Sequence, residues 1–100
     1  MQNNNKIMIQ IIHDRSIDEE IMEMLKKLNL KNYTKYLDIQ GVGENGPHLG
    51  DHIWPALNNA TLVVAGEELL EPLLRGVKEV QQKFPFVGLR AIVCPVITMV

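Results

Sequence analysis

The stretch Lys6–Leu28, KIMIQIIHDRSIDEEIMEMLKKL, decides the fold class because a strand pattern stands directly before a helix pattern. Within Lys6–Ile12, isoleucine occupies positions 7, 9 and 11, an alternation typical of a β-strand that buries one face. From Ile17 onward, apolar side chains recur every three or four positions, as in an amphipathic helix. These side chains are Ile17, Ile21, Met24, Leu25 and Leu28. The chain is therefore predicted to open with a β-α unit.

A polar turn over His13–Arg15 joins the two patterns, and His13 is expected to cap that turn. Ser16 is predicted to be the N-cap of the helix, because Glu19 stands three residues later and would complete a capping box. The helix is expected to continue to about Asn29.

The rest of the chain continues the alternation of strands and helices. Strands are predicted at Tyr33–Gln40, at Ala60–Ala65 and from Leu89 to about Thr98. A second helix is predicted over Glu67–Phe84, with an irregular first turn at Pro72. The order β-α-β-β-α-β favours a ferredoxin-like α+β domain, with a four-stranded antiparallel sheet and both helices on one face.

The sheet is expected to be apolar also on the face that the helices leave open. Ala91–Ile97 is apolar on both faces of its strand, and Met8 and Ile12 point away from the isoleucine row. Another subunit would cover such a face, so a homo-oligomer is predicted. Residues 1–100 form a single domain on this interpretation, with residues 1–5 as a disordered tail.

Composition limits the classes of function. The chain has 100 residues, 46% of them hydrophobic, and a formal net charge of -2, which disfavours nucleic acid as a partner. Cys94 is the single cysteine, so no internal disulfide forms, and it is expected to be an inert core residue. No apolar run reaches the about 18 residues of a membrane span, and Met1–Lys6 is too polar for a signal peptide. A cytoplasmic protein without membrane insertion is expected. The sequence shows no set of residues typical of a catalytic site, so an enzyme is not predicted.

Gly41–Asn59 is predicted to be a long functional loop, because it holds four glycines, two prolines, two histidines and the only Trp without clear periodicity. Its first six residues match G-x-G-x-x-G, but no helix follows, as a dinucleotide fingerprint requires. Two interpretations remain open. Asn45-Gly46 can reverse the chain between the flanking strands, or Gly41, Gly43 and Gly46 can form a nest of backbone N–H groups for an anion.

Further candidate residues lie in or near this loop. His48, Asp51 and His52 carry groups that ligate divalent metals, although such side chains can equally be solvated or lie at an interface. Trp54 is either an anchor that holds the loop to the body or a hot spot for a partner. Arg90, at the start of the last strand, needs an anion, which is either a ligand phosphate or a carboxylate of a neighbouring subunit.

A set of stretches in a fixed order carries a family resemblance. These are Tyr36–Gly43, Pro47–Gly50, His52–Pro55, Leu62–Val64 and Gly88–Val96. Together they resemble the PII family of signalling proteins, in its short PII-like branch, over nearly the whole chain. The resemblance implies homotrimers that bind an adenine nucleotide (ATP, ADP or AMP) in a cleft between subunits. It also implies a mobile loop that engages a target protein, such as a membrane transporter or a regulatory enzyme, with nitrogen regulation as the role of the better-known branch.

On this resemblance, Gly41 and Gly43 lie near the nucleotide phosphates, and Arg90 takes the place of the family's phosphate-binding Lys. The CutA divalent-cation tolerance proteins share the scaffold, so a metal-binding trimer that uses the loop histidines is the alternative. A third hypothesis is an interaction module without a small ligand, in which the loop completes the subunit interface.

Overall fold

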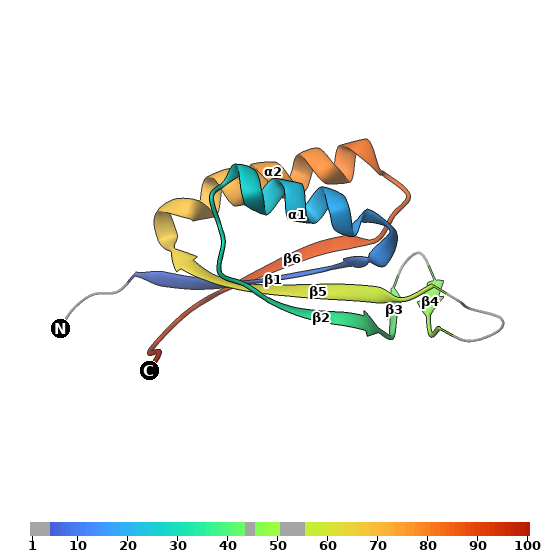
Figure 1. Cartoon of the computed structure of the whole chain (residues 1–100), viewed down its shortest axis with the longest axis horizontal. Helices are drawn as coiled ribbons and strands as arrows, with labels where there is room; N and C mark the ends of the chain where they lie inside the picture. Colours follow the sequence, from blue (N-terminus) through green and yellow to red (C-terminus); the bar gives the residue numbers. More distant parts are fainter. Residues whose placement is uncertain (1–4, 44–45, 51–55) are drawn as a thin grey trace.

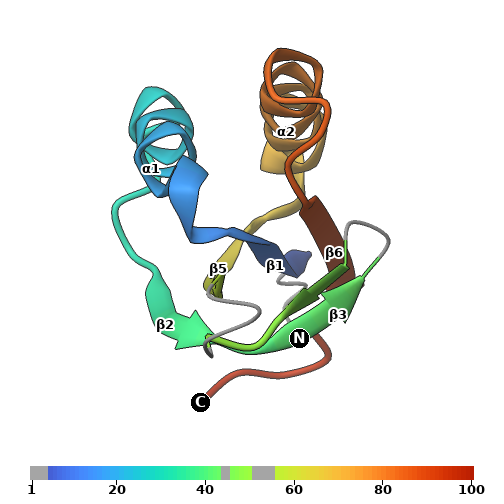
Figure 2. The ribbon, with the colours of Figure 1, turned by 90° about the vertical axis from the view of Figure 1, so that its right-hand side faces the viewer.

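The computed structural model describes residues 5–43, 46–50 and 56–100 and consists of a twisted sheet with two helices on one face (Figure 1, Figure 2). The main sheet is formed by β1 (Lys6–Asp14), β2 (Thr34–Ile39), β5 (Asn58–Gly66) and β6 (Leu89–Pro95). The strands lie in the order β2-β5-β1-β6, and every neighbouring pair is antiparallel. Helices α1 (Asp18–Lys27) and α2 (Leu70–Lys83) each follow a 3-10 turn, η1 (Arg15–Ile17) and η2 (Glu67–Leu69). The predicted ferredoxin-like fold is confirmed.

The hydrophobic core lies between the sheet and the two helices. Ile9 and Ile11 of β1 are fully buried, and Ile9 is paired with Val63 of β5 and Val93 of β6. The helices add the buried side chains Ile21, Met24, Leu25, Leu73 and Val77. The isoleucine row therefore marks the covered face of the central strand, as its alternation predicts. In the described part of the chain, neither helix has the length and apolar character needed to cross a membrane.

The opposite face of the sheet is largely apolar and carries no helix. Met8 of β1 is paired with Val64 on β5 and with Cys94 on β6, and none of these three side chains is fully buried. Ile92 lies further along the same face and is 43% exposed. The prediction that Cys94 belongs to the core is wrong, because its register with Met8 places it on this open face. We refer to this surface below as the open face.

The junction between β1 and α1 differs from the prediction. β1 continues through His13 and Asp14, so His13 does not cap a turn but is a strand residue that is 1% exposed. The side chain of Asp14 accepts a hydrogen bond from the backbone N–H of Ser16 at 2.8 Å and so caps η1. α1 begins two residues after Ser16, behind Ile17, without a side-chain cap. The predicted Ser16 cap is wrong because Asp14 is the N-cap and Ser16 lies inside η1, where its own N–H is the one that is capped.

Gly41–Asn59 is more regular than a long loop. β3 (Gly41–Gly43) and β4 (Gly46–His48) pair as a small antiparallel hairpin, in which Gly43 stands opposite Gly46. The chain therefore reverses between these two glycines and not directly between the long strands. The backbone N–H of Gly50, a residue with φ +70°, donates to the carbonyl oxygen of Ala56 at 3.2 Å, and β5 begins two residues earlier than predicted, at Asn58.

The second half of the chain follows the prediction closely. The expected irregular start of the second helix is the 3-10 turn η2, and Pro72 lies in the first turn of α2, where its missing N–H removes no helical hydrogen bond. β6 ends at Pro95, earlier than the expected end at about Thr98.

Candidate functional site

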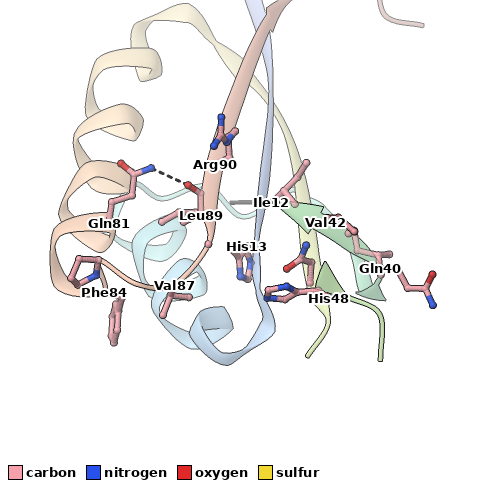
Figure 3. Close-up of a pocket in the computed structure, with 16 residues that line it drawn as sticks. Ile12, His13, Gln40, Val42, His48, Gln81, Phe84, Val87, Leu89 and Arg90 are labelled. Carbon is pink, nitrogen blue, oxygen red and sulfur yellow. Dashed lines mark hydrogen bonds between the residues drawn. The ribbon is translucent and has the colours of Figure 1, made fainter. Parts of the chain in front are cut away.

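A cavity of about 580 Å³ lies at one end of the main sheet, between the β3–β4 hairpin and the turn that leads from α2 to β6 (Figure 3). Figure 3 shows Val42 and His48 of the hairpin on one side, and Phe84 and Val87 of the turn on the other, with His13 between them. The end of β1 contributes the floor, because β1 is flanked by β5 and β6 and its last residues reach the base of both loops.

Three of the four residues predicted to bind a nucleotide line this one cavity. Gly41 and Gly43 border it from β3, and Arg90 borders it from β6, where it is paired with Ile12. A methyl group at Gly43 would meet no atom of the described residues within 4 Å, whereas at Gly41 it would lie 2.8 Å from Nδ2 of Asn58. Gly43 therefore presents bare backbone to the cavity without any need for close packing. Gly46, the fourth predicted residue, stands opposite Gly43 in the hairpin.

Among the described residues, side-chain hydrogen bonds hold the base of the hairpin near the cavity. Nε2 of His48 lies 2.7 Å from Oδ2 of Asp14, whose Oδ1 accepts the hydrogen bond from the backbone N–H of Ser16. Nε2 of Gln40 donates to the carbonyl oxygen of Leu49 at 2.9 Å. The first bond joins the end of β4 to the end of β1, and the second joins the residue before β3 to the residue after β4, so both act at the base of the hairpin.

The Asp14 carboxylate is stabilised in its ionised form. Partial burial alone raises the pKa of this carboxyl group, but the hydrogen bonds from Ser16 and His48 outweigh it, so that the pKa lies below its ordinary value. The Asp14 carboxylate therefore stays ionised near neutral pH, with the Ser16 N–H and the His48 ring as its hydrogen-bond partners.

His13 borders the cavity with a side chain that is almost fully buried. Its Nδ1 lies 2.8 Å from the carbonyl oxygen of Asp14, which can only accept, so Nδ1 carries the proton. Its Nε2 is buried, has no hydrogen-bond partner among the described residues and lies 3.7 Å from Oδ1 of Asp18. Residue type alone could not indicate this role, because the burial of His13 arises from the packing of η1 and β5 around the end of β1.

A buried polar network fixes the end of β2, from which the hairpin departs. Nδ2 of Asn59, a side chain that is 5% exposed, donates to Oδ1 of Asp18 at 2.9 Å, and its Oδ1 accepts from the backbone N–H of Asp38 at 3.0 Å. Asp38 has φ +56° in a bulge between Tyr36 and Ile39, an unusual backbone conformation for Asp. Nη1 of Arg15 donates a hydrogen bond to Oδ1 of Asp38 at 2.9 Å.

Asp18 is the centre of this network. It also accepts a hydrogen bond from Nζ of Lys35 at 2.6 Å. Partial burial raises the pKa of its carboxyl group, but the hydrogen bonds from Lys35 and Asn59 outweigh that effect and lower the pKa below the ordinary value. The sequence analysis did not select Asn59. The signal was the pair of consecutive asparagines at the start of a strand, because Asn is depleted in strands.

Most of the remaining predicted site residues lie outside the part of the chain that the structure describes. Asp51, His52 and Trp54 lie outside the described residues, so only His48 of the proposed metal ligands has a known position, beside Asp14. Among the residues that are described, no group of three His, Cys, Asp or Glu side chains is placed to hold a metal ion. The metal site and the role of Trp54 stay predictions.

Comparison with known proteins gives structural similarity at low sequence identity. No protein-family model and no curated protein sequence matches the chain. Its structure is similar to CPII, a nitrogen regulatory PII-like protein from Thiomonas intermedia K12 that was solved bound to ADP, AMP and bicarbonate. The TM-score is 0.75 and the identity 22%, over 91% of this chain and 85% of that one.

Two further structures extend this comparison. PII of Arabidopsis thaliana bound to citrate gives a TM-score of 0.69 and 16% identity, over 94% of this chain and 79% of that one. A DUF3240 family protein from Shewanella baltica OS155 gives 0.72 and 15% identity, over 99% and 96%. PII and PII-like proteins are thus structural neighbours across the whole chain, and the fold is the one they share.

Proposed function

We propose that this protein is a PII-like signalling protein that binds an adenine nucleotide in the cavity at the end of the sheet. In this proposal, residues 41–59 report the occupancy of the cavity to a target protein. The observation that carries the proposal is the meeting of Gly41, Gly43 and Arg90, three residues selected from sequence alone, around one cavity. The nucleotides ADP and AMP in the similar CPII structure support the choice of ligand.

The chemistry of the cavity suits a phosphorylated ligand with an apolar part. Bare backbone at Gly41 and Gly43 lets phosphate oxygens approach N–H groups, and the Arg90 guanidinium supplies positive charge from the other side. Apolar side chains for a base or ribose come from Ile12, Phe84, Val87 and Leu89. The volume of about 580 Å³ is within the range of ligand pockets, about 300–1,000 Å³.

Signalling would follow from the way the hairpin is held. A ligand that contacts both β3 and β6 makes more contacts in one position of the hairpin than in another. Its binding therefore stabilises that position. The His48–Asp14 and Gln40–Leu49 hydrogen bonds are the side-chain restraints that such a movement has to break or keep. A target protein that contacts the hairpin would then distinguish the two positions.

The functional unit in this proposal is a homotrimer. The open face, with Met8, Leu62, Val64, Ile92 and Cys94, is an apolar surface that water would otherwise cover. Burial against further copies of the chain is the simplest way to remove it from water. Sedimentation at micromolar concentration is expected to give three times the mass of the chain, and a monomer would contradict this part of the proposal.

Thermal unfolding with and without ADP, AMP and ATP tests the ligand. A nucleotide at 100 times its dissociation constant should stabilise the fold by about 2.7 kcal/mol. Arg90→Gln should reduce this shift, whereas Lys31→Gln, which removes an exposed cation outside the cavity, should not. Gly43→Ala should leave the unliganded fold intact, since there is space for the methyl group, yet weaken nucleotide binding. Equal shifts in all variants, or no shift with any nucleotide, would overturn the proposal.

A further inference from the structure

The two helices enclose a second cavity, on the opposite side of the helical layer from the sheet core. The cavity has a volume of about 550 Å³ and is lined by both α1 and α2, which stand apart above the sheet in Figure 2. Its apolar residues are Met24 and Leu28 from α1, and Pro72, Gly76 and Val80 from α2. We call this surface the helix groove.

The floor of the helix groove combines a bare helix backbone with an adaptable side chain. A methyl group at Gly76 would lie 2.8 Å from Cγ of Met24, so glycine is what allows Met24 to rest on α2. Glycine inside a helix costs about 1 kcal/mol relative to alanine, and the close contact with Met24 accounts for its presence. Methionine is unbranched and polarizable, and it is common on surfaces that adjust to a partner.

The rim of the helix groove is charged but not paired. Helix α1 supplies Glu19, Glu20, Glu23 and Lys27, and α2 supplies Arg75, Glu79 and Lys83. None of these side chains forms an ion pair within 4 Å of another described residue; the ion pairs of the described part of the chain all lie elsewhere. Apart from Lys83, whose Nζ lies 5.5 Å from the centroid of the Phe84 ring, no rim charge has a charged or aromatic partner among the described residues, so these charges can pair with charges of a third element.

The rim charges are also sorted along the groove. The helices run antiparallel in Figure 1, with Met24 opposite Gly76, so residues before Met24 lie beside residues after Gly76. One end therefore holds Glu19, Glu20, Glu23 and Glu79 against the single cation Lys83, and the other end holds Lys27 and Arg75. Because side chains tilt toward the N-terminus of their own helix, Glu23 and Arg75 lean further apart.

We propose that the helix groove binds an amphipathic helix of a target protein that has an acidic first turn and a basic last turn. The acidic turn lies over Lys27 and Arg75, and the basic turn lies over the four glutamates, so the bound helix runs antiparallel to α1. Acidic first and basic last turns also suit the dipole of the incoming helix. The ten residues of α1 span about 15 Å, which sets a contact of about three helical turns.

The test uses two synthetic 14-residue helical peptides with the same leucine stripe and opposite charge order. The protein carries labelled methionine methyl groups, observed by NMR, and the peptide with acidic first and basic last turns should shift the Met24 signal. The signals of Met8, on the open face, and Met99, in the C-terminal segment, should stay unchanged and serve as internal controls. The reversed peptide should bind at least 5-fold more weakly.

Charge variants make the assignment specific. The double variant E20K/E23K should weaken the matching peptide at least 5-fold and strengthen the reversed one, because both substitutions lie on the acidic end. Glu71→Lys makes one such charge reversal, half the charge change of the double variant, on an exposed residue of α2 outside the groove and should leave both affinities unchanged. No shift of Met24 with either peptide, equal binding of both peptides, or equal weakening by Glu71→Lys would overturn the proposal.

Discussion

Replacement of Asn59 by alanine should disrupt the polar network and leave the hydrophobic core intact. Asn59 makes one hydrogen bond to the Asp18 carboxylate at 2.9 Å and one from the Asp38 N–H at 3.0 Å. A hydrogen bond to a charged group contributes about 1.5–3 kcal/mol and a neutral one about 0.5–1.5 kcal/mol. The free energy of unfolding should therefore fall by about 2–4 kcal/mol, measured by urea denaturation.

The location of the damage distinguishes this explanation from general destabilisation. Asp38 keeps its strained φ of +56° only while its N–H is held, so Asn59→Ala should speed hydrogen exchange at Asp38 far more than at Ile9 in the core. Because β3 departs directly after β2, nucleotide affinity should fall as well. Asn32→Ala, in the exposed connection after α1, is the matched control and should change neither quantity.

A small and even response to Asn59→Ala would contradict this role of the side chain. A loss of less than about 1 kcal/mol, with Asp38 exchange unchanged, would mean that the bulge holds its conformation without Asn59. A large loss with faster exchange throughout the sheet would mean that Asn59 supports the core and not the base of the hairpin.

Three further predictions concern pH, assembly and metal. Folding lowers the pKa values of Asp14 and Asp18, so their ionised carboxylates stabilise the folded state. This stabilisation is fully present above the ordinary pKa of about 4 and is lost as the pH falls through the lower pKa values of the folded state. The urea midpoint should therefore drop in this acidic range, and it should drop less in the variant Asp18→Asn. Ile92→Lys on the open face should give monomers in sedimentation, whereas trimers would show that this face is not the interface. If the loop binds zinc, the double variant H48A/H52A should lose zinc-dependent thermal stabilisation, and unchanged stabilisation would remove these histidines as ligands.

The order of the elements was predictable because each element repeats its own period over many residues. The isoleucine alternation of β1 and the apolar stripe of α1 are local signals, and both appear in the structure as predicted. The start of α1 was not predictable in the same way. Asp14 and Ser16 are both good capping residues two positions apart, and only the continuation of β1 beside Asn58 and Leu89 decides that Asp14 takes the role.

The candidate site was predictable only where residue type carries the chemistry. Gly41, Gly43 and Arg90 could be selected because glycine exposes backbone and an arginine next to an apolar strand needs an anion. His13 and Asn59 could not be placed, because what matters about them is burial, and burial depends on contacts between segments far apart in the sequence. Asn59, for example, bonds to residues 41 and 21 positions away.

These buried polar residues explain how the fold positions a site at one end of a regular sheet. On the helix-facing side, β1 carries Ile7, Ile9 and Ile11 and then His13, while β5 carries Val63 and then Thr61 and Asn59. The core thus changes from apolar to polar as it approaches the cavity. If only stability were selected, the apolar row would continue, because buried polar groups add little to the free energy of unfolding even when they are paired.

The polar end of the core instead holds the β2 bulge through the Asp38 N–H and holds α1 through Asp18. Asn59 therefore joins the end of β2, from which the hairpin departs, to the first turn of α1. Apolar substitution there can leave the sheet folded and still move β3 relative to Arg90. The position of the site is in this sense determined separately from the stability of the fold, which is what the Asn59→Ala experiment measures.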